Sequence, residues 1–434
     1  MLLQFLFVLT AIIIGARLQG IGLGIMGGLG LAILTFGFGL QPTAPPIDVM
    51  LMIVAVIAAA SCMQAAGGLD LMVAIAERFL RKHPSRITLL SPLVTYLFTF
   101  VAGTGHVAYS VLPVIAEVAR ETKIRPERPL SIAVIASQQA ITASPISAAT
   151  VALLSILSGH AITLLDILII SIPSTLVGVL LGALACMKMG KELEQDPEYL
   201  QRLASGMFAN DKKADNSSAN LISKAGLSIA IFISATIAII LFGSIESLRQ
   251  MGSTTLNMPI IIEIIMLSAA AIILLVTKTD GIKAAQGSVF TAGMQAVVAI
   301  FGIAWMGDTF INGNITELQA SIEGIITDMP WIFGVALFVM SILLYSQAAT
   351  VRALMPLGVA LGISPWMLIA LFPAVNGYFF LPNYPTVVAA INFDRTGTTG
   401  IGKWVLNHSF MLPGLIATIG AVSTGLLLIT LLSK

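Results

Sequence analysis

Residues 141–150, ITASPISAAT, and residues 381–390, LPNYPTVVAA, each interrupt a long apolar run with prolines and small polar residues. Proline has no backbone N–H and clashes with the preceding helical turn, so Pro145, Pro382 and Pro385 rule out one unbroken helix through either run. In a bilayer, the freed backbone groups must face protein or a water-filled cavity. Two such breaks at matching places predict a binding site at membrane depth, although prolines also kink helices that are merely packed together.

The composition around these breaks excludes a soluble protein. The 434 residues are 57% hydrophobic and 10% charged, with a mean hydropathy of +0.98, whereas a soluble domain has about 25% charged residues. The net charge of +1 gives no reason to expect nucleic acid or another polyanion as a partner. Cys62 and Cys186 lie in apolar runs and make neither a disulfide framework nor a zinc site. The sequence therefore predicts an all-α polytopic membrane protein.

Basic residues orient the apolar runs. Runs at 1–16, 20–40 and 47–66 come first, and the loop between the second and third has no basic residue. Because basic loops stay on the cytoplasmic side, the N-terminus is expected outside. The same rule places all but three of the 22 Lys and Arg residues on the cytoplasmic side and both termini on the periplasmic side. The first run has no positive region before it, so we expect a retained helix.

Two stretches are too short for two full crossings of about 20 residues each. Residues 87–119 lie between two basic loops and are broken near the middle by Gly103–Thr104–Gly105. We expect an inner re-entrant helical hairpin, which enters from the cytoplasm, turns at membrane depth and leaves. Residues 331–362, turning near Tyr345–Ser346–Gln347, are expected to form the outer hairpin.

The two halves show weak but ordered similarity, with inverted orientation. Thr104 in the inner hairpin precedes a proline by the same number of residues as Gln347 in the outer hairpin. The fold is therefore expected to hold two inverted-topology repeats, with about ten transmembrane helices plus the two hairpins. The expected units are a first repeat at 1–187 with its broken helix at 130–155, a cytoplasmic linker at 188–222, and a second repeat at 223–434 with its broken helix at 366–392.

Helix ends at the breaks present unpaired N–H groups and positive partial charge, which suit an anion such as a carboxylate. Two opposing sets of ends suit a molecule with two carboxylates. Polar side chains at the turns and breaks are the candidate substrate-binding residues, although each has an alternative role in capping a helix or bonding a neighbouring helix. They are Thr104, Gly105, His106 and Tyr109 on the inner hairpin, Gln138, Thr142, Ser144 and Ser147 in the first broken helix, Ser346, Gln347, Thr350 and Arg352 on the outer hairpin, and Asn376, Asn383, Tyr384 and Thr386 in the second broken helix.

Two of these candidates, Arg352 and His106, stand out by their charge chemistry. A guanidinium within the membrane costs about 3 kcal/mol on insertion scales, so it faces a partner or a cavity. Arg352 is the first candidate for a bidentate carboxylate clamp. The alternatives are an ion pair with Asp308 or Glu323 at the outer rim, or snorkelling. His106 titrates near neutral pH and is suited to a proton relay, with a structural hydrogen bond as the plainer interpretation.

One motif points away from nucleotide chemistry. Residues 22–27, GLGIMG, match the dinucleotide-binding pattern by letter but lie inside an apolar span with no strand before them. Close helix packing through small residues explains them. The sequence has no HExxH, Walker loop or paired-cysteine motif. We therefore expect no enzyme, no metal site and no cofactor.

Five segments resemble the Dcu family of anaerobic C4-dicarboxylate transporters, and the resemblance runs the full length. It implies a multi-pass protein of the bacterial inner membrane that moves succinate, fumarate, malate or aspartate, typically exchanging external fumarate or aspartate for internal succinate. The broader superfamily implies an elevator mechanism, in which hairpins and broken helices slide against a scaffold of the remaining helices, and a scaffold that forms a homodimer. The segments are AGTGHVAYSVLPVIAEVA (102–119), RPLSIAVIASQQAITASPISAA (128–149), AWMGDTF (304–310), YSQAATVRALMP (345–356) and FDRTGTTGIGK (393–403).

Other functions stay open at this point. Sodium- or proton-coupled uptake of the same anions is the alternative within transport, and a channel or a sensor is the alternative from another class. The preferred dicarboxylate and any regulatory protein partner do not follow from the sequence.

Overall fold

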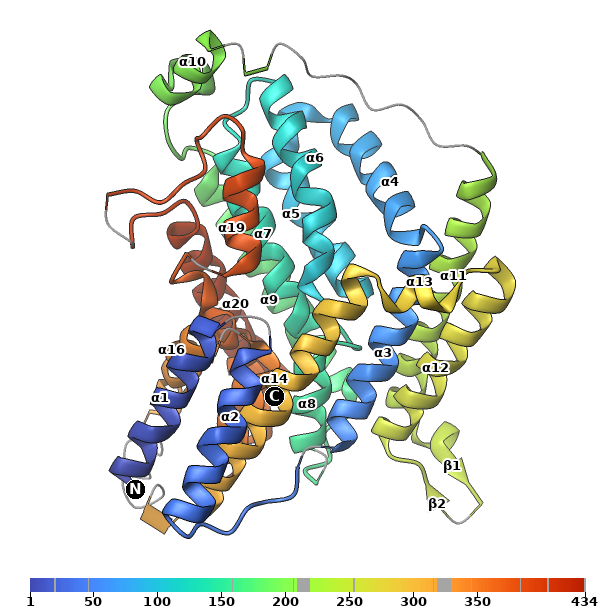
Figure 1. The fold of residues 1–434 in the computed structure, drawn as a ribbon, viewed down its shortest axis with the longest axis vertical. Coiled ribbons are helices and arrows are strands. Elements are labelled where there is room, and N and C mark those ends of the chain that lie inside the picture. The colour runs from blue at the N-terminus through green and yellow to red at the C-terminus, as the bar shows by residue number, and fades with distance from the viewer. Residues whose placement is uncertain are drawn as a thin grey trace.

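The computed structural model describes residues 1–434 apart from 19–20, 46, 158, 206, 209–218, 253, 315, 318–328, 345, 383, 404–405 and 433–434. Helices make up most of this part of the chain, and a short antiparallel ribbon lies at one end of the molecule (Figure 1). The helices of the first half are α1 (Leu2–Leu18), α2 (Gly22–Ala32) with a π-helical turn (Ile33–Gly37), α3 (Ile47–Ala65), α4 (Gly68–Lys82), α5 (Ile87–Ala102), α6 (Ala108–Glu121), α7 (Glu127–Ala143), α8 (Ala148–Ile156) and α9 (Leu164–Cys186). The second half holds α10 (Pro197–Ala204), α11 (Ala219–Ser244), β1 (Gln250–Met251), β2 (Thr254–Thr255), α12 (Met258–Thr277), α13 (Gly281–Ala285), α14 (Ser288–Gly313), α16 (Ile332–Leu344), α17 (Gln347–Ala360), α18 (Pro365–Leu371), α19 (Pro385–Phe393) and α20 (Met411–Leu432).

The long helices form two groups of neighbours. In the scaffold group, α1 packs on α2, α2 on α14, α14 on α3, α3 on α12 and α12 on α11. In the hairpin group, α5 packs on α6 and α7, α7 on α9, α9 on α20, and α20 on α18. The outer hairpin joins this group, because α16 packs on α17, α17 on α8, and α8 on α7. Figure 1 shows α5, α6 and α7 extending beyond α11, α12 and α13, toward the end of the molecule that carries α10.

The contact between α2 and α14 depends on glycine. A methyl group on Gly302 of α14 would overlap the carbonyl oxygen of Gly24 in α2, and one on Gly27 would overlap the backbone of Gly302. The two backbones therefore touch directly, as small residues allow in membrane helices. This contact confirms the interpretation of residues 22–27 as a packing motif.

Both proline-containing runs are interrupted. Residues 144–147 separate α7 from α8, and residues 372–384, which include two short 3-10 turns, separate α18 from α19. Ser147 caps α8 by accepting a hydrogen bond from the Thr150 N–H. At the corresponding position of α19, Tyr384 provides no side-chain cap.

The basic stretch after α3, which the sequence suggests is a loop, forms the amphipathic helix α4 instead. It is bent by 67° from α3, and Gly67 at the bend has φ +84°, in the left-handed region that glycine adopts without strain. Leu69, Met72, Ala76 and Leu80 are buried at helical spacing. The charged residues of this stretch lie on the other faces of the helix.

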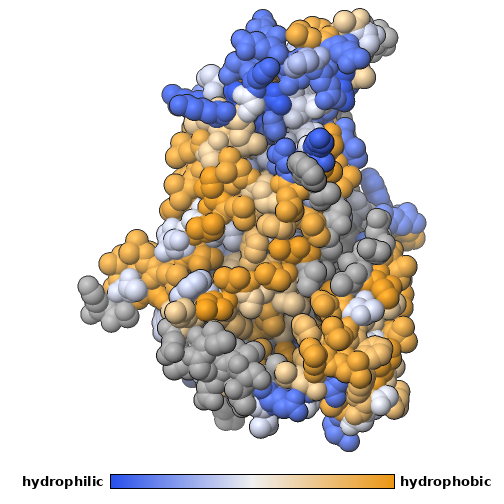
Figure 2. All heavy atoms as spheres, turned by 90° about the vertical axis from the view of Figure 1, so that its left-hand side faces the viewer, coloured by the Kyte–Doolittle hydropathy of each residue, from blue (hydrophilic) through white to orange (hydrophobic). Residues whose placement is uncertain are grey.

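The surface has an apolar belt. Figure 2 shows hydrophobic residues across the middle of the molecule, with hydrophilic residues gathered at the upper end and a smaller group at the lower end. Within the described ranges, six helices are long and apolar enough to cross a membrane, or seven if the bent α3–α4 pair counts as one span. The expected number of about ten crossings and two re-entrant hairpins stays a prediction.

Candidate functional site

A buried hydrogen-bonded network lies where the two broken helices meet. Its centre is Asn376, which is 1% exposed and stands between the two 3-10 turns of the second break. Its Nδ2 donates to Oε1 of Gln139 at 3.2 Å and to Oγ1 of Thr142 at 3.4 Å, both on α7. Its Oδ1 accepts a hydrogen bond from Nε2 of Gln347 on α17 at 3.1 Å. Uncharged side chains thus join three elements that are far apart in the sequence.

Further contacts extend this Asn376 network. Gln347 also donates to the hydroxyl of Tyr378, whose ring lies 4.2 Å from that of Tyr384, centroid to centroid. Gln139 Nε2 donates to Oγ1 of Thr418 on α20 at 3.1 Å. A buried polar network with its groups paired fixes the relative positions of the elements that it joins.

A second pair lies beside the network, at the start of α19. Gln138 and Thr386 are 2% and 3% exposed, and Nε2 of Gln138 donates to Oγ1 of Thr386 at 3.3 Å. In the described part of the chain, Oε1 of Gln138 is buried without a hydrogen-bond partner, a situation that costs about 1–3 kcal/mol. The Gln138 amide lies at the N-terminal end of α19, which carries positive partial charge. If the amide rotates, Oε1 accepts from the Thr386 hydroxyl and Nε2 can donate to another group.

Hydroxyl groups tie the inner hairpin, formed by α5 and α6, to α7 and to the break that follows it. The hydroxyls of Thr99 and Ser137 lie 2.7 Å apart, and Ser137 Oγ donates to the carbonyl oxygen of Gly105 at 3.4 Å. Ser144 Oγ donates to the carbonyl oxygen of Phe100 at 2.7 Å. Gly105 and Ser144 thus hold the tip of the hairpin against the break.

Three other candidates make local contacts of the helix-capping kind. Ser147 Oγ donates to the carbonyl oxygen of Ile141 at 2.6 Å, in addition to capping α8. Ser346 caps α17 by accepting from the Ala349 N–H at 3.2 Å. Thr350 Oγ1 donates to the carbonyl oxygen of Ser346 at 2.8 Å. These contacts correspond to the alternative role that the sequence left open.

A small cavity of about 80 Å³ lies between the tip of the inner hairpin and the scaffold group. Thr104 supplies the hydroxyl in a lining that is otherwise apolar or glycine, so the cavity alone does not suit a dicarboxylate. The cavity is lined by Ala102, Gly103, Thr104, Ile146 and Ala148 on the hairpin side, and by Ile53, Val56, Ile57, Ala60, Val289 and Gly293 on the scaffold side.

Arg352 of α17 lies near α14 and interacts electrostatically with Asp308. The two helices are close here, because a Cβ added to Gly307 would lie 3.7 Å from Cα of Ala353. Of the two carboxylates considered as ion-pair partners, Asp308 is thus a neighbour. Glu323 lies outside the described residues.

The remaining candidates lie around the second break. Tyr109 of α6 and Tyr384 interact electrostatically. The inner hairpin therefore lies close to the start of α19. Asn383 lies outside the described residues, and so does the side chain of His106.

Several residues of the site were not predicted. Gln139 follows Gln138 directly, and the two amides reach different partners, so the adjacent pair was the available signal. Tyr378 lies in the second break, but in the sequence it is one aromatic residue among others in an apolar run. Thr418 and Ser137 lie in helices without a break at those positions, and the sequence gives no signal for them.

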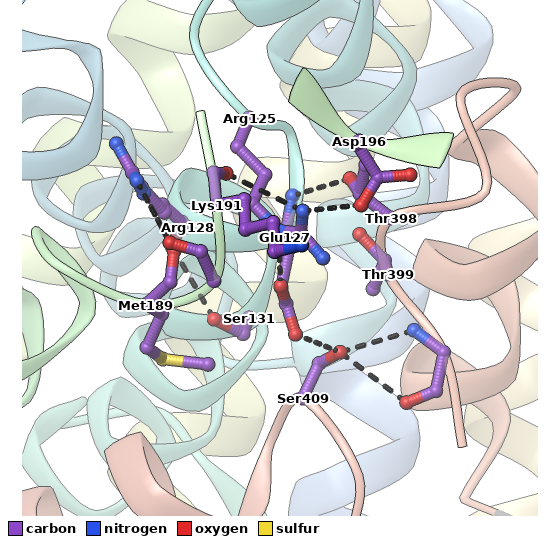
Figure 3. Close-up of polar contacts among 12 residues, drawn as sticks. Arg125, Glu127, Arg128, Ser131, Met189, Lys191, Asp196, Thr398, Thr399 and Ser409 are labelled. Carbon is purple, nitrogen blue, oxygen red and sulfur yellow. Dashed lines mark hydrogen bonds and ion pairs between the residues drawn. The ribbon is translucent and has the colours of Figure 1, made fainter. Parts of the chain in front are cut away.

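A second polar cluster lies at the end of the molecule that carries α10 (Figure 3). Glu127, at the start of α7, accepts hydrogen bonds from Nε of Arg125 at 2.5 Å and from Oγ of Ser409 at 2.7 Å. Nη1 of Arg125 also donates to Asp196, the N-cap of α10, at 2.6 Å. Burial alone would raise the pKa of Asp196, but this bond and those from backbone N–H groups lower it overall. The cluster ties the linker to the first turn of α7.

Comparison with known proteins decides the family. A family model described as "Anaerobic c4-dicarboxylate membrane transporter" matches residues 1–433. The chain belongs to this family. The C4-dicarboxylate transporter DcuA of Wolinella succinogenes is 43% identical to this transporter over 436 residues, with 99% of each chain covered. The DcuA of Escherichia coli K12 is 44% identical over 434 residues and 99% of each chain. The anaerobic C4-dicarboxylate transporter DcuB of Escherichia coli O6:H1 is 41% identical over 425 residues and 95% of each chain.

A solved structure shares the fold of this transporter. The YdaH transporter of Alcanivorax borkumensis superposes with a TM-score of 0.55 at 15% identity, over 95% of this chain and 98% of that one. At this identity the likeness concerns the fold alone. With the family matches, it makes this chain a multi-pass membrane transporter of mostly helical fold, and not an enzyme.

Proposed function

We propose that this transporter exchanges C4-dicarboxylates across the bacterial inner membrane, taking in fumarate, malate or aspartate and releasing succinate, with both termini periplasmic. The observation that carries the proposal is the Asn376 network, because it joins both breaks and α17 through groups that have no charge to neutralise. A doubly negative substrate would then meet helix ends and neutral donors. The relatives named as C4-dicarboxylate transporters support the substrate class.

One carboxylate is proposed to bind at the start of α19. Rotation of the Gln138 amide lets the hydroxyl of Thr386 donate to Oε1, which turns Nε2 toward the ligand. First-turn N–H groups that no Tyr384 side chain caps supply further donors and a favourable helix dipole. Hydrogen bonds to a charged acceptor are stronger than neutral ones, so two or three such donors are sufficient for a carboxylate.

The second carboxylate is proposed to bind Arg352. In the absence of substrate, Asp308 supplies the negative charge that a guanidinium needs at this depth. A dicarboxylate would compete with Asp308 for the guanidinium. Binding would then alter the contact between α17 of the outer hairpin and α14 of the scaffold group.

Repeated packing supports two inverted repeats, at 1–187 and 223–434, joined by the linker at 188–222. If the halves are copies, α1, α2 and α3 correspond to α11, α12 and α14. The α2–α14 contact then corresponds to the α12–α3 contact, and the α1–α2 contact to the α11–α12 contact. Two half-sites related in this way suit alternating access from the two sides of the membrane.

An elevator motion is proposed for the hairpin group. Its helices pack on one another more extensively than on the scaffold group, and a cavity lies between the two at the tip of the inner hairpin. In this grouping α9 and α20 move with the hairpins, whereas the sequence assigned them to the scaffold. The scaffold group would carry the contact of a homodimer.

Counterflow in proteoliposomes tests the exchange. Vesicles preloaded with succinate should take up labelled fumarate faster than empty vesicles, and a transmembrane gradient of sodium or protons should make little difference. Uptake that ignores preloading and follows an imposed cation gradient would replace exchange by coupled symport. Flux that responds to neither would favour a channel. Empty liposomes and preloading with a C4 monocarboxylate serve as controls.

A further inference from the structure

Helix α4 carries an outward stripe that mixes large apolar side chains with cations. Ile75 and Phe79 are 59% and 43% exposed. Arg78 and Lys82 on the helix, and Arg86 just after it, are also exposed. Residues three, four and seven apart share one face of a helix, so Ile75, Arg78, Phe79 and Lys82 lie on one side of α4. Arg86 follows in the 3-10 turn Pro84–Arg86. We call these five residues the outward stripe of α4.

The three cations of this stripe differ from Arg81, the fourth basic residue of the segment, in their ion pairing. Arg81 is paired with Glu77 on α4 and with Glu121 at the end of α6, which ties the two helices together. Among the residues for which the structure gives positions, no carboxylate lies within ion-pair distance of the three stripe cations. The charge of the stripe is therefore available to an external anion.

The stripe starts at the level of a membrane boundary. Helix α11 qualifies as a membrane span from Ser223 onward. A Cβ added to Gly67, just before α4, would lie 3.7 Å from Cβ of Ala225, and one on Gly226 would lie 3.8 Å from Leu71. The beginning of α4 is thus beside the first turn of that span. Figure 1 shows α4 between α6 and α11, running toward the end of the molecule that carries α10.

We propose that the outward stripe of α4 binds the headgroups of anionic phospholipids. Ile75 and Phe79 insert at the boundary of the acyl chains, while Arg78, Lys82 and Arg86 meet the phosphates. Amphipathic helices with this arrangement lie in the membrane interface, and each cation near an anionic surface adds to the affinity. The apolar side chains favour a lipid over a soluble anion, because they have no role in binding a free phosphate.

Native mass spectrometry of the purified full-length protein tests the proposal. Phosphatidylglycerol is titrated against phosphatidylcholine, and the retained lipid gives an apparent Kd for each. The variant R78Q/K82Q/R86Q should bind phosphatidylglycerol about 100-fold more weakly, with phosphatidylcholine unchanged. The matched control K188Q/K278Q/K283Q removes the same charge from three other exposed cations and should bind as the wild type does.

Three results would overturn the proposal. Equal losses in both variants would reduce the effect to net charge, and no loss in the stripe variant would remove the site. Displacement of the lipid by millimolar inorganic phosphate would make it a site for small anions. If the triple variant does not purify as a monodisperse protein, R78Q/K82Q against K188Q/K278Q makes the same comparison. None of these outcomes depends on which substrate is transported.

Discussion

Gln138 is the residue on which the proposed carboxylate site depends most. It is nearly fully buried, bonded to Thr386 on one side, and its Oε1 has no partner in the described chain. We expect Gln138→Leu to raise the Kd for dicarboxylates about 10- to 100-fold, because a hydrogen bond to a charged group contributes about 1.5–3 kcal/mol. Binding of labelled succinate to detergent-purified protein measures it.

Ser346→Ala is the control for this variant. It removes a hydroxyl that caps α17, so it should lower the melting temperature and leave the Kd near the wild-type value. Wild-type affinity in Gln138→Leu would place the carboxylate elsewhere.

Arg352 and Asp308 give a second residue-scale prediction, whose sign distinguishes two roles for the arginine. If the substrate competes with Asp308 for the guanidinium, Asp308→Asn should tighten dicarboxylate binding, and Arg352→Gln should weaken it at least about tenfold. Isothermal titration of both single variants and the double variant measures this. A purely structural ion pair would instead leave the affinity unchanged and lower the stability of both single variants.

At the scale of residues, the sequence predicted the residue types of the site better than it predicted their hydrogen-bond partners. It selected Gln138, Thr142, Gln347 and Asn376, which do lie together with Thr386 in one buried region. It missed Gln139 because neighbouring residues on a helix point about 100° apart, and nothing in the sequence says which of them faces the break. It could not show that Ser147 and Ser346 are engaged as caps, since capping and ligand binding use the same residue types.

At the scale of elements, the crossing of α2 and α14 is set by backbone contact. Gly302→Ala should lower the free energy of unfolding by about 1–3 kcal/mol, because the new methyl group overlaps Gly24. Gly28→Ala in α2 is the matched control. Its Cβ would enter open space, so this variant should be neutral or gain about 1 kcal/mol from helix propensity. Thermal unfolding in the same detergent compares them, and equal melting temperatures would contradict the direct contact.

The contact between α10 and α7 should depend on acid. The pKa of Asp196 is lowered in the folded state, so its contribution is fully present above the ordinary carboxyl pKa and disappears as the pH falls through the folded value. We expect the protection of amides in residues 196–204, relative to their intrinsic exchange rates, to fall below about pH 4. Arg125→Gln should abolish most of this pH dependence. An unchanged profile in that variant would mean that the arginine does not hold the linker.

The structure shows the interruption of both proline-containing runs and differs from the sequence interpretation at α4. Apolar run lengths and prolines place the interruptions of both broken runs, because a missing N–H acts locally. Helix α4 was overlooked because its basic residues suggest a cytoplasmic loop. Its buried stripe consists of only four residues, Leu69, Met72, Ala76 and Leu80. The local signal for the bend was the Gly67–Gly68 pair, because Gly67 adopts φ +84° there.

At the scale of the whole molecule, charge and hydropathy predict the class and an orientation but not the grouping of helices. The superfamily resemblance implied a scaffold of all helices outside the hairpins and broken helices, which would include α9 and α20. In the structure, α9 packs on α7 and α20 packs on α18. The sequence could not predict this grouping, because long-range packing depends on side-chain fit between segments distant in the sequence. The central claim is therefore that the hairpin group moves as one body against the scaffold group.

Crosslinking across the boundary tests that claim most directly. Thr104 of the inner hairpin and Val289 of α14 line the same cavity from opposite sides. In a background without Cys62 and Cys186, we expect a bifunctional thiol reagent that joins Thr104→Cys to Val289→Cys to stop succinate–fumarate counterflow in proportion to the crosslinked fraction. Joining Tyr96→Cys of α5 to Thr175→Cys of α9, two neighbours within the hairpin group, should leave exchange intact. Full exchange by completely crosslinked T104C/V289C protein would contradict a hairpin group that slides against the scaffold.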